Sequence, residues 1–415
     1  MPFVTELVCD CCGAVYPHDQ PVLLCRRCSG LLDARYDYAA IKRAFDLNDI
    51  PHRRPTVWRW HEFLPVSEPR YRVDIGAGGS PLIYCPRLTE WIGAHRVYVK
   101  YDGMQPTASL KDRSFAVAVA KAAELGVRGA ITYSSGNAAA ALAAHAGHIG
   151  MRGLILVNAW CDQAKLAMLR GYGMPVVLLN WSRFQDVEAL MLHAIKDLKL
   201  FAFVNFQNPW RHEGNKTYAF EIWWDLQRTV PDHEIHPIGT GGGIFGALKG
   251  YRELIAVGLS DHVPHLHGTQ PAACHSLVTA FQNHRTQATP EGNPHATIAE
   301  AIANDVPLDA GRRPLRAMYE SNGVALAISD EEMLDGIRRL GQEGISAEPA
   351  GATTVWAARH LAERGIIKDD ETVVCVVTAS GLKQPMALEE SERAELPTLD
   401  VSNDALDRLI EKWGI

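Results

Sequence analysis

The chain has 415 residues, of which 47% are hydrophobic and 21% charged, and this length is enough for two or three domains with cores of their own. Its formal net charge of -7 argues against nucleic acid or an acidic membrane surface as the main partner, because either would favour a basic face. No segment approaches the roughly 20 apolar residues of a membrane span. The first residues lack the basic start and apolar core of a secretion signal, so we expect a cytoplasmic protein.

Four of the nine cysteines have the spacing of a zinc ribbon. Two residues separate Cys9 from Cys12, two separate Cys25 from Cys28, and twelve lie between the pairs. Each pair can lie on a tight turn with both thiolates directed at one ion. We expect a structural zinc site, because four protein ligands leave no position for a substrate. Two disulfides, or a site that has lost its metal, are the alternatives, and Cys11 is a spare thiol or a competing ligand.

After the ribbon, residues 33–75 contain several prolines that interrupt any long helix, and we interpret them as an irregular arm. From Ser80 onward, continuous apolar runs typical of strands alternate with helical patterns, which predicts parallel sheets covered on both faces. The predicted strands are 96–100, 130–133, 153–157, 175–179, 236–238 and 373–377, the clearest helices are 115–125, 138–148 and 186–198, and 283–294 is predicted to be a surface loop.

Three polar segments follow predicted strands and are candidates for one binding cleft: Pro106–Arg113, Ser134–Asn137 and Gly239–Gly243. In open α/β sheets, ligands bind beyond the carboxyl ends of the strands. The glycines offer backbone N–H groups at a helix start, which suits a phosphate, although tight turns use the same residues. Lys111 supplies a single amine in the first segment, or it is an exposed lysine paired with Asp112. Together the three segments predict a pyridoxal-phosphate site.

These motifs resemble, in identity, order and approximate spacing, those of the threonine synthase branch of the fold-type II pyridoxal-phosphate enzymes, from the ribbon to about residue 385. Residues 76–82 are similar to the family's Gly-Glu-Gly-x-Thr-Pro-Leu, and 106–113 to Pro-Thr-Gly-Ser-Phe-Lys-Asp-Arg. Residues 134–137 are similar to Ser-Thr-Gly-Asn. Residues 204–217 are similar to Val-Asn-Ser-x-Asn-Pro-x-Arg-x-Glu-Gly-Gln-Lys-Thr.

The resemblance implies a role for each matching residue. Lys111 would bind the cofactor covalently and act as the catalytic base. The other cofactor-binding residues would be Asn137, Gly239, Thr240, Gly241, Gly242, Gly243 and Thr378. The residues that bind the substrate would be Thr107, Ser109, Ser134, Ser135, Gly136, Asn205 and Arg211, the last at the leaving phosphate.

Considered alone, three of these residues have structural explanations. Asn137 is a candidate helix N-cap, and Thr378 a hydroxyl that caps backbone at a strand end. Arg211 is a candidate partner of Glu213 or another acid in an ion pair.

The sequence also departs from the family pattern. Phe206 replaces a serine, which would remove a hydroxyl donor and add apolar bulk beside the leaving group. Ala77 replaces glutamate, Ala108 glycine and Leu110 phenylalanine, and Thr240 and Gly243 replace asparagines. A retained cofactor frame with an altered substrate wall is typical of a relative with a different amino-acid substrate.

We therefore predict two open, mostly parallel α/β domains of the fold-type II (tryptophan synthase β-like) kind, preceded by a zinc ribbon. The predicted boundaries are 1–32 for the ribbon, 33–75 for the arm, 76–100 with 206–395 for the large cofactor domain, 101–205 for the small mobile domain and 396–415 for a C-terminal helix. The resemblance also implies a homodimer.

The leading functional hypothesis is a lyase that eliminates phosphate from an activated amino acid. O-phospho-L-homoserine is the expected substrate, and added water would yield L-threonine. The alternatives are β-replacement on O-phosphoserine, as in cysteate synthases, deamination of a hydroxy amino acid, and a non-catalytic relative that binds an amino acid or a protein. His265 and His267 would share one strand face, but we expect exposed or hydrogen-bonded histidines there and not a second metal site.

Overall fold

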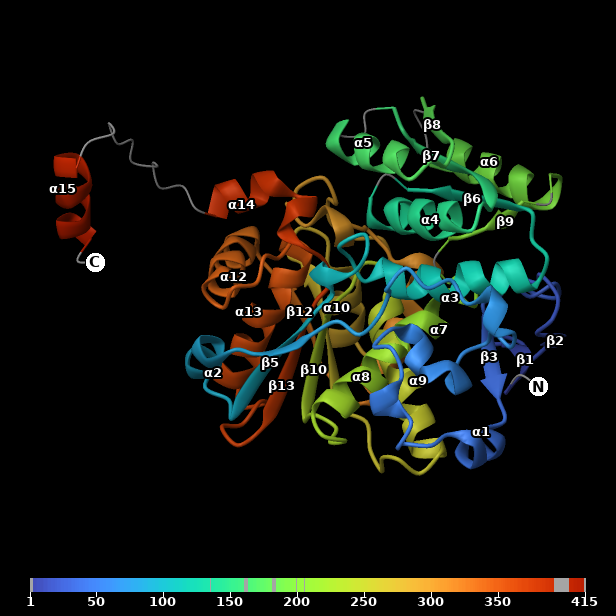
Figure 1. Cartoon of the computed structure of the whole chain (residues 1–415), viewed down its shortest axis with the longest axis horizontal. Helices are drawn as coiled ribbons and strands as arrows, with labels where there is room; N and C mark the ends of the chain where they lie inside the picture. The colour runs from blue at the N-terminus through green and yellow to red at the C-terminus, as the bar shows by residue number, and fades with distance from the viewer. Residues whose placement is uncertain are drawn as a thin grey trace.

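Three β-sheets and the helices that cover them form the part of the chain described by the computed structural model (Figure 1). The described residues are 3–134, 136–159, 163–180, 184–198, 200–204, 206–391 and 403–413. Among them, no helix combines the length and the apolar character that a bilayer crossing needs.

The N-terminal sheet has three antiparallel strands in the order β2-β1-β3. They are β1 (Val4–Cys9), β2 (Val15–Pro17) and β3 (Leu32–Tyr36). The segment that follows has one short helix, α1 (Tyr38–Ala44), which Asp37 caps by accepting a hydrogen bond from the backbone of Ala40. Three 3-10 turns, 50–52, 57–63 and 69–71, complete it. The predicted absence of a long helix in this arm is confirmed for its residues, all of which are described.

The largest sheet has six strands in the order β12-β11-β10-β13-β5-β4, and only the edge pair β4–β5 is antiparallel. The strands are β4 (Leu82–Tyr84), β5 (Arg96–Tyr101), β10 (His233–Pro237), β11 (His265–Pro271), β12 (Ala325–Ile328) and β13 (Thr372–Val377).

Both faces of this sheet are buried, as the apolar strand sequences predict. On β13, Val373 and Cys375 face one cluster of buried residues, and Val374 and Val376 face another. One face is covered by α2 (Pro86–Ile92), α12 (Asp330–Gln342) and α13 (Pro349–Glu363), and the other by α8 (Thr217–Asp225), α9 (Gly242–Ala256), α10 (Ser276–Gln282) and α11 (Arg312–Glu320) (Figure 1).

A second, smaller sheet has four parallel strands in the order β8-β7-β6-β9. Its strands are β6 (Gly129–Tyr133), β7 (Arg152–Asn158), β8 (Val176–Leu179) and β9 (Phe201–Ala202), and its helices are α4 (Asn137–His148), α5 (Gln163–Gly171) and α6 (Phe184–Lys196). The buried helix α3 (Lys111–Glu124) packs against both α4 and α7 (Arg211–Asn215), and so joins this sheet to the rest.

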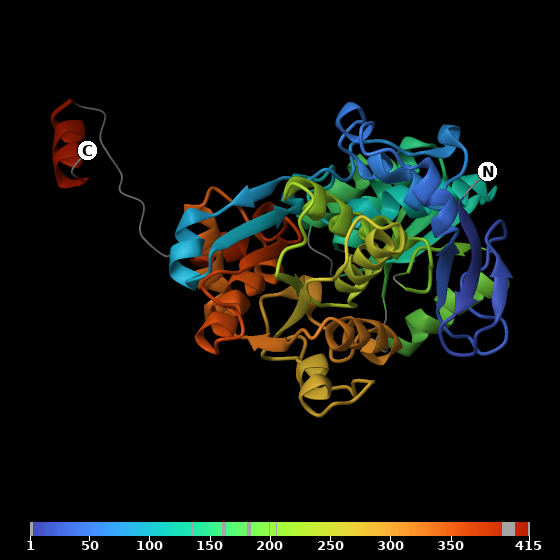
Figure 2. The same cartoon turned by 90° about the horizontal axis from the view of Figure 1, so that it is seen from below.

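The predicted strands and helices are present, with boundaries shifted by a few residues; the predicted strand 236–238 begins earlier, at His233. Strands β11 and β12 were not predicted, because β11 includes polar residues and β12 has only four residues. After α14 (Pro385–Ser391), helix α15 (Asn403–Trp413) lies apart from the other elements in both views (Figures 1 and 2).

Candidate active site

Lys111 is the first residue of α3, and hydrogen bonds between two loops place it beside Thr378. The backbone N–H of Leu110 donates to the carbonyl of Thr378 at 2.8 Å, and the N–H of Ser380 donates to the carbonyl of Ala108 at 3.1 Å. The two loops leave the carboxyl ends of β5 and β13, which are neighbouring parallel strands. Ala108 has φ +58°, in the left-handed region that favours glycine, and the family motif has glycine at this position.

The residue after Lys111 holds this loop in place. Asp112 Oδ2 accepts hydrogen bonds from the backbone N–H and the hydroxyl of Thr107, both at 2.9 Å, and Asp112 Oδ1 lies 3.0 Å from His145 Nε2 on α4. The hydroxyl proton of Thr107 is therefore directed at Asp112. Ser109 is completely buried, and neither residue lines the cleft described below.

A buried ion network lies under the start of α3. Arg113 pairs with Asp102 at 2.9 Å and with Glu221 at 2.6 Å, and its guanidinium stacks 4.3 Å from the centre of the Tyr218 ring. Lys100 pairs with the same Glu221 at 2.9 Å. All these charges are buried and mutually compensated, so they give the lysine loop a rigid base.

A cleft of about 1430 Å³ brings together most of the predicted site residues, from both the large and the small sheet. Its lining includes Lys111, Ser134, Gly136, Asn137, Arg211, Gly239, Thr240, Gly241, Gly242, Gly243 and Thr378. Two predicted substrate residues, Ser135 and Asn205, lie outside the described residues.

The glycine run forms the start of α9, directly after β10. Gly241 is the N-cap with φ +87°, and a Cβ atom there would lie 2.5 Å from Pro314. No side chain caps this helix, so the N–H groups of its first turn are available at the cleft. Backbone N–H groups at a helix N-terminus suit a phosphate, and this loop therefore fits the phosphate of the predicted cofactor.

Asn137 is not the N-cap of its helix. The cap position of α4 is Gly136, and Asn137 directs its side chain across the cleft, where Nδ2 donates to Glu348 Oε2 at 3.2 Å. Glu348 precedes α13 and is almost completely buried. The amide is thus held by a carboxylate from the large sheet's side of the cleft, which no local sequence motif had indicated.

Arg211 begins α7 and is buried, and it forms no ion pair with any carboxylate in the described part of the chain. Its Nη1 donates to the carbonyl of Phe203 at 3.1 Å, and its guanidinium stacks 4.4 Å from the centre of the Phe115 ring. None of the described residues forms a hydrogen bond with its Nε. The expected alternative partner, Glu213, instead pairs with Lys216 at 2.7 Å and with Lys249 at 2.6 Å. An uncompensated buried cation that lines a cleft is suited to an anionic ligand.

The same surroundings change the ionisation of the lysine. Burial, assisted by the charge of Arg211, lowers the pKa of Lys111 to about 8, while Glu348 acts in the opposite direction. Burial lowers the pKa of Arg211 to about 9, which leaves the guanidinium charged at neutral pH. The cleft therefore combines a lysine that can lose its proton near neutral pH with a fixed positive charge.

Phe206 does not line the cleft, which corrects the expectation that its ring adds apolar bulk to the substrate wall. Its ring is completely buried with Leu31 and Phe245, and the guanidinium of Arg313 stacks 5.1 Å from its centre. Phe206 therefore fills the contact between the ribbon and helices α9 and α11. Gln207 and Val204, on either side of it, line the cleft instead.

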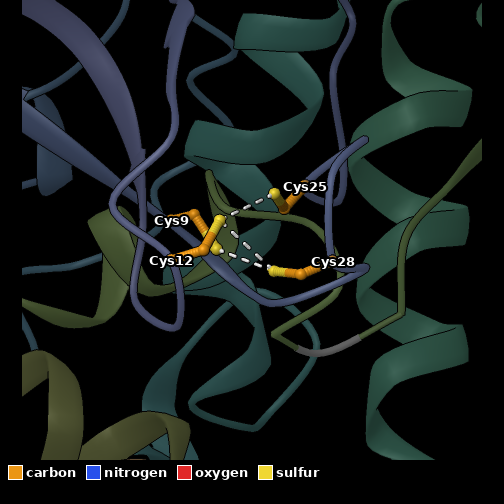
Figure 3. A group of neighbouring side chains, drawn as sticks. All are labelled: Cys9, Cys12, Cys25 and Cys28. Carbon is orange, nitrogen blue, oxygen red and sulfur yellow. Dashed lines mark hydrogen bonds between the residues drawn. The ribbon is translucent and has the colours of Figure 1, made fainter.

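The four predicted zinc ligands converge (Figure 3). The sulfur atoms of Cys9 and Cys28 are 3.5 Å apart, those of Cys12 and Cys28 are 3.5 Å apart, and those of Cys12 and Cys25 are 3.6 Å apart. Four thiolates at about 2.3 Å from one zinc ion would lie roughly 3.8 Å from each other, whereas a disulfide needs about 2.05 Å. The group fits a tetrahedral metal site, and Cys11 is exposed and outside it.

His265 and His267 share one face of β11, as expected, with the ring of His233 stacked 5.2 Å from each. His233 Nδ1 lies 2.9 Å from His267 Nε2, and His233 Nε2 lies 2.9 Å from a carboxylate oxygen of Glu371. The histidines form a hydrogen-bonded stack, and among the described residues they belong to no group with metal-ligand geometry.

Three parts of the cleft were not found from the sequence: Glu348, His236 on β10, and a segment around residues 300–310. Each comes from a part of the chain without a recognisable motif. His236 lay within a predicted strand, but only the arrangement of the folded chain shows that its side chain lines the cleft.

Comparisons with known proteins agree with this geometry. The family model described as pyridoxal-phosphate dependent enzyme matches residues 73–379. A threonine synthase from Methanosarcina acetivorans is 38% identical over 408 residues, which cover 98% of each chain. Another, from Methanocaldococcus jannaschii, is 38% identical over 91% of this chain and 93% of the relative.

Solved structures share the fold at low sequence identity. Maize serine racemase has a TM-score of 0.64 at 17% identity, covering 81% of this chain and 94% of that chain. Threonine deaminase isoform 2 from Solanum lycopersicum has a TM-score of 0.64 at 19% identity, covering 89% of this chain and 90% of that chain.

Proposed function

Because the chain belongs to the pyridoxal-phosphate-dependent enzymes, in their threonine synthase-like branch, we propose that it eliminates phosphate from O-phospho-L-homoserine and adds water to yield L-threonine. The observation that carries this proposal is Arg211, a buried arginine that lines the cleft and has no carboxylate partner among the described residues. Its guanidinium supplies the second anion site that such a substrate needs.

The cofactor, when bound, withdraws electrons from the α-carbon of the amino acid. Lys111 is positioned to remove and return protons there, because its burial favours the neutral amine near pH 8. Asn137, held by Glu348, contacts the cofactor ring in this proposal, and Thr378 faces the ring nitrogen. A hydroxyl at that position does not enforce a protonated ring, which favours elimination and replacement over transamination.

The cofactor phosphate, the substrate carboxylate and the leaving phosphate have separate binding sites in this proposal. The first turn of α9, with Gly239–Gly243, binds the cofactor phosphate in this proposal. Ser134 and Gly136, in the loop before α4, bind the substrate carboxylate. Arg211 binds the leaving phosphate, and this arrangement keeps the three anionic groups apart.

Replacing Arg211 tests the proposal. In Arg211→Gln we expect kcat/KM for O-phosphohomoserine to fall about 100-fold, since about 2.7 kcal/mol of charged hydrogen bonding to the leaving group is lost. O-acetylhomoserine, whose leaving group carries less charge, serves as the control substrate. Its turnover in the variant should change by less than about 3-fold, and Arg211→Lys should recover part of the loss. An equal loss with both substrates would contradict a role at the phosphate.

We also propose that the ribbon binds one structural zinc ion through Cys9, Cys12, Cys25 and Cys28. Its support is the distance between the sulfur atoms, which fits a tetrahedral site. The homodimer and the cytoplasmic location expected from the sequence remain predictions.

A further inference from the structure

Strand β10 ends in a buried acid–histidine pair beside the glycine loop. Glu234 and His236 lie two residues apart on one face of the strand, and Glu234 Oε1 is 2.7 Å from His236 Nε2. Both side chains are almost completely buried, yet His236 lines the cleft together with Gly239–Gly243. The pair is not used by the chemistry described above.

The other oxygen of Glu234 has a neutral partner. Tyr251 on α9 donates its hydroxyl hydrogen to Glu234 Oε2 at 2.8 Å. Burial and the nearby Glu234 raise the pKa of Tyr251 well above its usual range, so this phenol stays protonated. Among the described residues, His236 is the only basic group that pairs with Glu234. A buried carboxylate needs hydrogen-bond donors, and the imidazole of His236 is placed to supply one of them.

The second ring nitrogen of His236 faces the glycine loop. A Cβ atom at position 243 would lie 3.3 Å from His236 Nδ1, and Gly243 leaves this space open. The ring is fixed edge-to-face against Tyr218, with 5.8 Å between ring centres. No described group forms a hydrogen bond with Nδ1, so this nitrogen is available to a ligand in the cleft.

We propose that His236, held by Glu234, donates a hydrogen bond from Nδ1 to the cofactor phosphate and adds a positive charge to the phosphate site. This inference rests on the proposed binding of the phosphate by the glycine loop. It also accounts for two departures from the family motif: Thr240 and Gly243 replace asparagines, so the loop lacks two side-chain amides. A charged donor from β10 compensates for them.

The test compares pyridoxal 5'-phosphate with pyridoxal, which lacks the phosphate. For each apoprotein, the dissociation constants of both compounds are measured by absorbance titration. In His236→Asn we expect the constant for pyridoxal 5'-phosphate to rise about 10-fold or more, while that for pyridoxal changes less than about 2-fold. Glu234→Gln should give a smaller rise of the same kind.

His233→Asn is the matched control. His233 is a buried histidine at the opposite end of the same strand, it pairs with Glu371 at 2.9 Å, and it does not line the cleft. In His233→Asn, the ratio of the dissociation constants for pyridoxal 5'-phosphate and pyridoxal should equal that of the unaltered protein. An unchanged ratio in His236→Asn, or an equal loss for both compounds, would overturn the inference.

A second measurement needs no variant. In the unaltered protein loaded with cofactor and labelled with 15N-histidine, both ring nitrogens of His236 should have the chemical shifts of protonated nitrogens. An unprotonated Nδ1 would overturn the inference even if His236→Asn failed to fold. Borohydride reduction and mass spectrometry of the Lys111 peptide separate the two proposals. A missing adduct contradicts the proposed function, whereas an adduct with an unchanged ratio contradicts only the role of His236.

Discussion

Two charges of opposite sign act on Lys111, and their effects make its ionisation testable. Burial and Arg211 lower the pKa of Lys111 to about 8, and Glu348 opposes them. Only the neutral amine can bond to the cofactor, so we expect the rate of covalent cofactor binding by the apoprotein to rise with pH, with a midpoint near 8. The rate is measured by stopped-flow absorbance.

Two variants should shift this midpoint in opposite directions. Arg211→Gln removes a positive charge that lowers the pKa of Lys111, so the midpoint should move upward. Glu348→Gln removes a negative charge that raises it, so the midpoint should move downward. A midpoint near the ordinary lysine value of about 10.4, or shifts in the same direction, would contradict this description of the site.

Single residues were predictable where a motif surrounds them. Lys111 and Asn137 lie in short segments whose neighbours resemble a family pattern, and both line the cleft. Glu348 and His236 could not be found in this way, because they meet the site only through the folding of distant strands and helices. The direction of a side chain could not be predicted from the sequence either. Phe206 has φ +58°, and its ring packs with Leu31 of the ribbon and Phe245 of α9.

At the scale of elements, buried charges attach the N-terminal sheet to the helices that begin at the cleft. Asp33 on β3 lies 2.7 Å from Lys249 on α9 and 3.2 Å from His212 on α7. Tyr36 donates its hydroxyl hydrogen to Glu213 on α7 at 2.6 Å. Helix α7 begins with Arg211 and α9 follows the glycine loop, so the N-terminal sheet holds the two helices that carry these residues to the cleft.

Breaking this attachment should destabilise the protein. In Asp33→Asn the buried Lys249 and His212 lose their shared carboxylate. We expect the free energy of unfolding to fall by about 3 kcal/mol and the melting temperature to fall by about 5 °C. Arg35→Gln is the control, since Arg35 is 53% exposed and lies 3.8 Å from the same carboxylate. It should change the melting temperature by about 1 °C at most. Equal shifts in the two variants would contradict the attachment.

The zinc site can be tested with two exposed cysteines of the ribbon. Cys28 belongs to the group of four thiols and Cys11 does not. We expect Cys28→Ser to lose the metal and Cys11→Ser to retain one zinc ion per chain, as measured by elemental mass spectrometry of the purified proteins. Zinc lost equally from both variants, or absent from the unaltered chain, would contradict the proposed site.

Elements were predictable where the hydrophobic pattern is continuous. The buried strand β13 and the alanine-rich helices α3 and α4 are examples, because apolar runs of this kind fit only a covered sheet or a buried helix. Strand β11 includes His265, His267 and Gln270, each of which forms a hydrogen bond with a neighbour from another element, and its pattern is hidden because these side chains are polar.

At the scale of the whole molecule, the cleft is formed by residues from both large groups of elements. Ser134 and Asn137 lie at the start of α4 beside the four-stranded sheet, whereas Lys111 begins α3 and Thr378 directly follows β13 of the six-stranded sheet. A relative movement of the two groups would change the access of water to the substrate. The general architecture follows from the order of motifs, but the lining of the cleft required the folded chain.

In the proposed reaction, this chain converts O-phospho-L-homoserine into L-threonine. The most direct test incubates the cofactor-loaded protein with O-phosphohomoserine and, separately, with O-phosphoserine, and identifies the amino-acid products and the phosphate. We predict threonine and phosphate in equal amounts from O-phosphohomoserine, and none from Lys111→Ala. Phosphate released only from O-phosphoserine, or from neither compound, would contradict the proposed reaction.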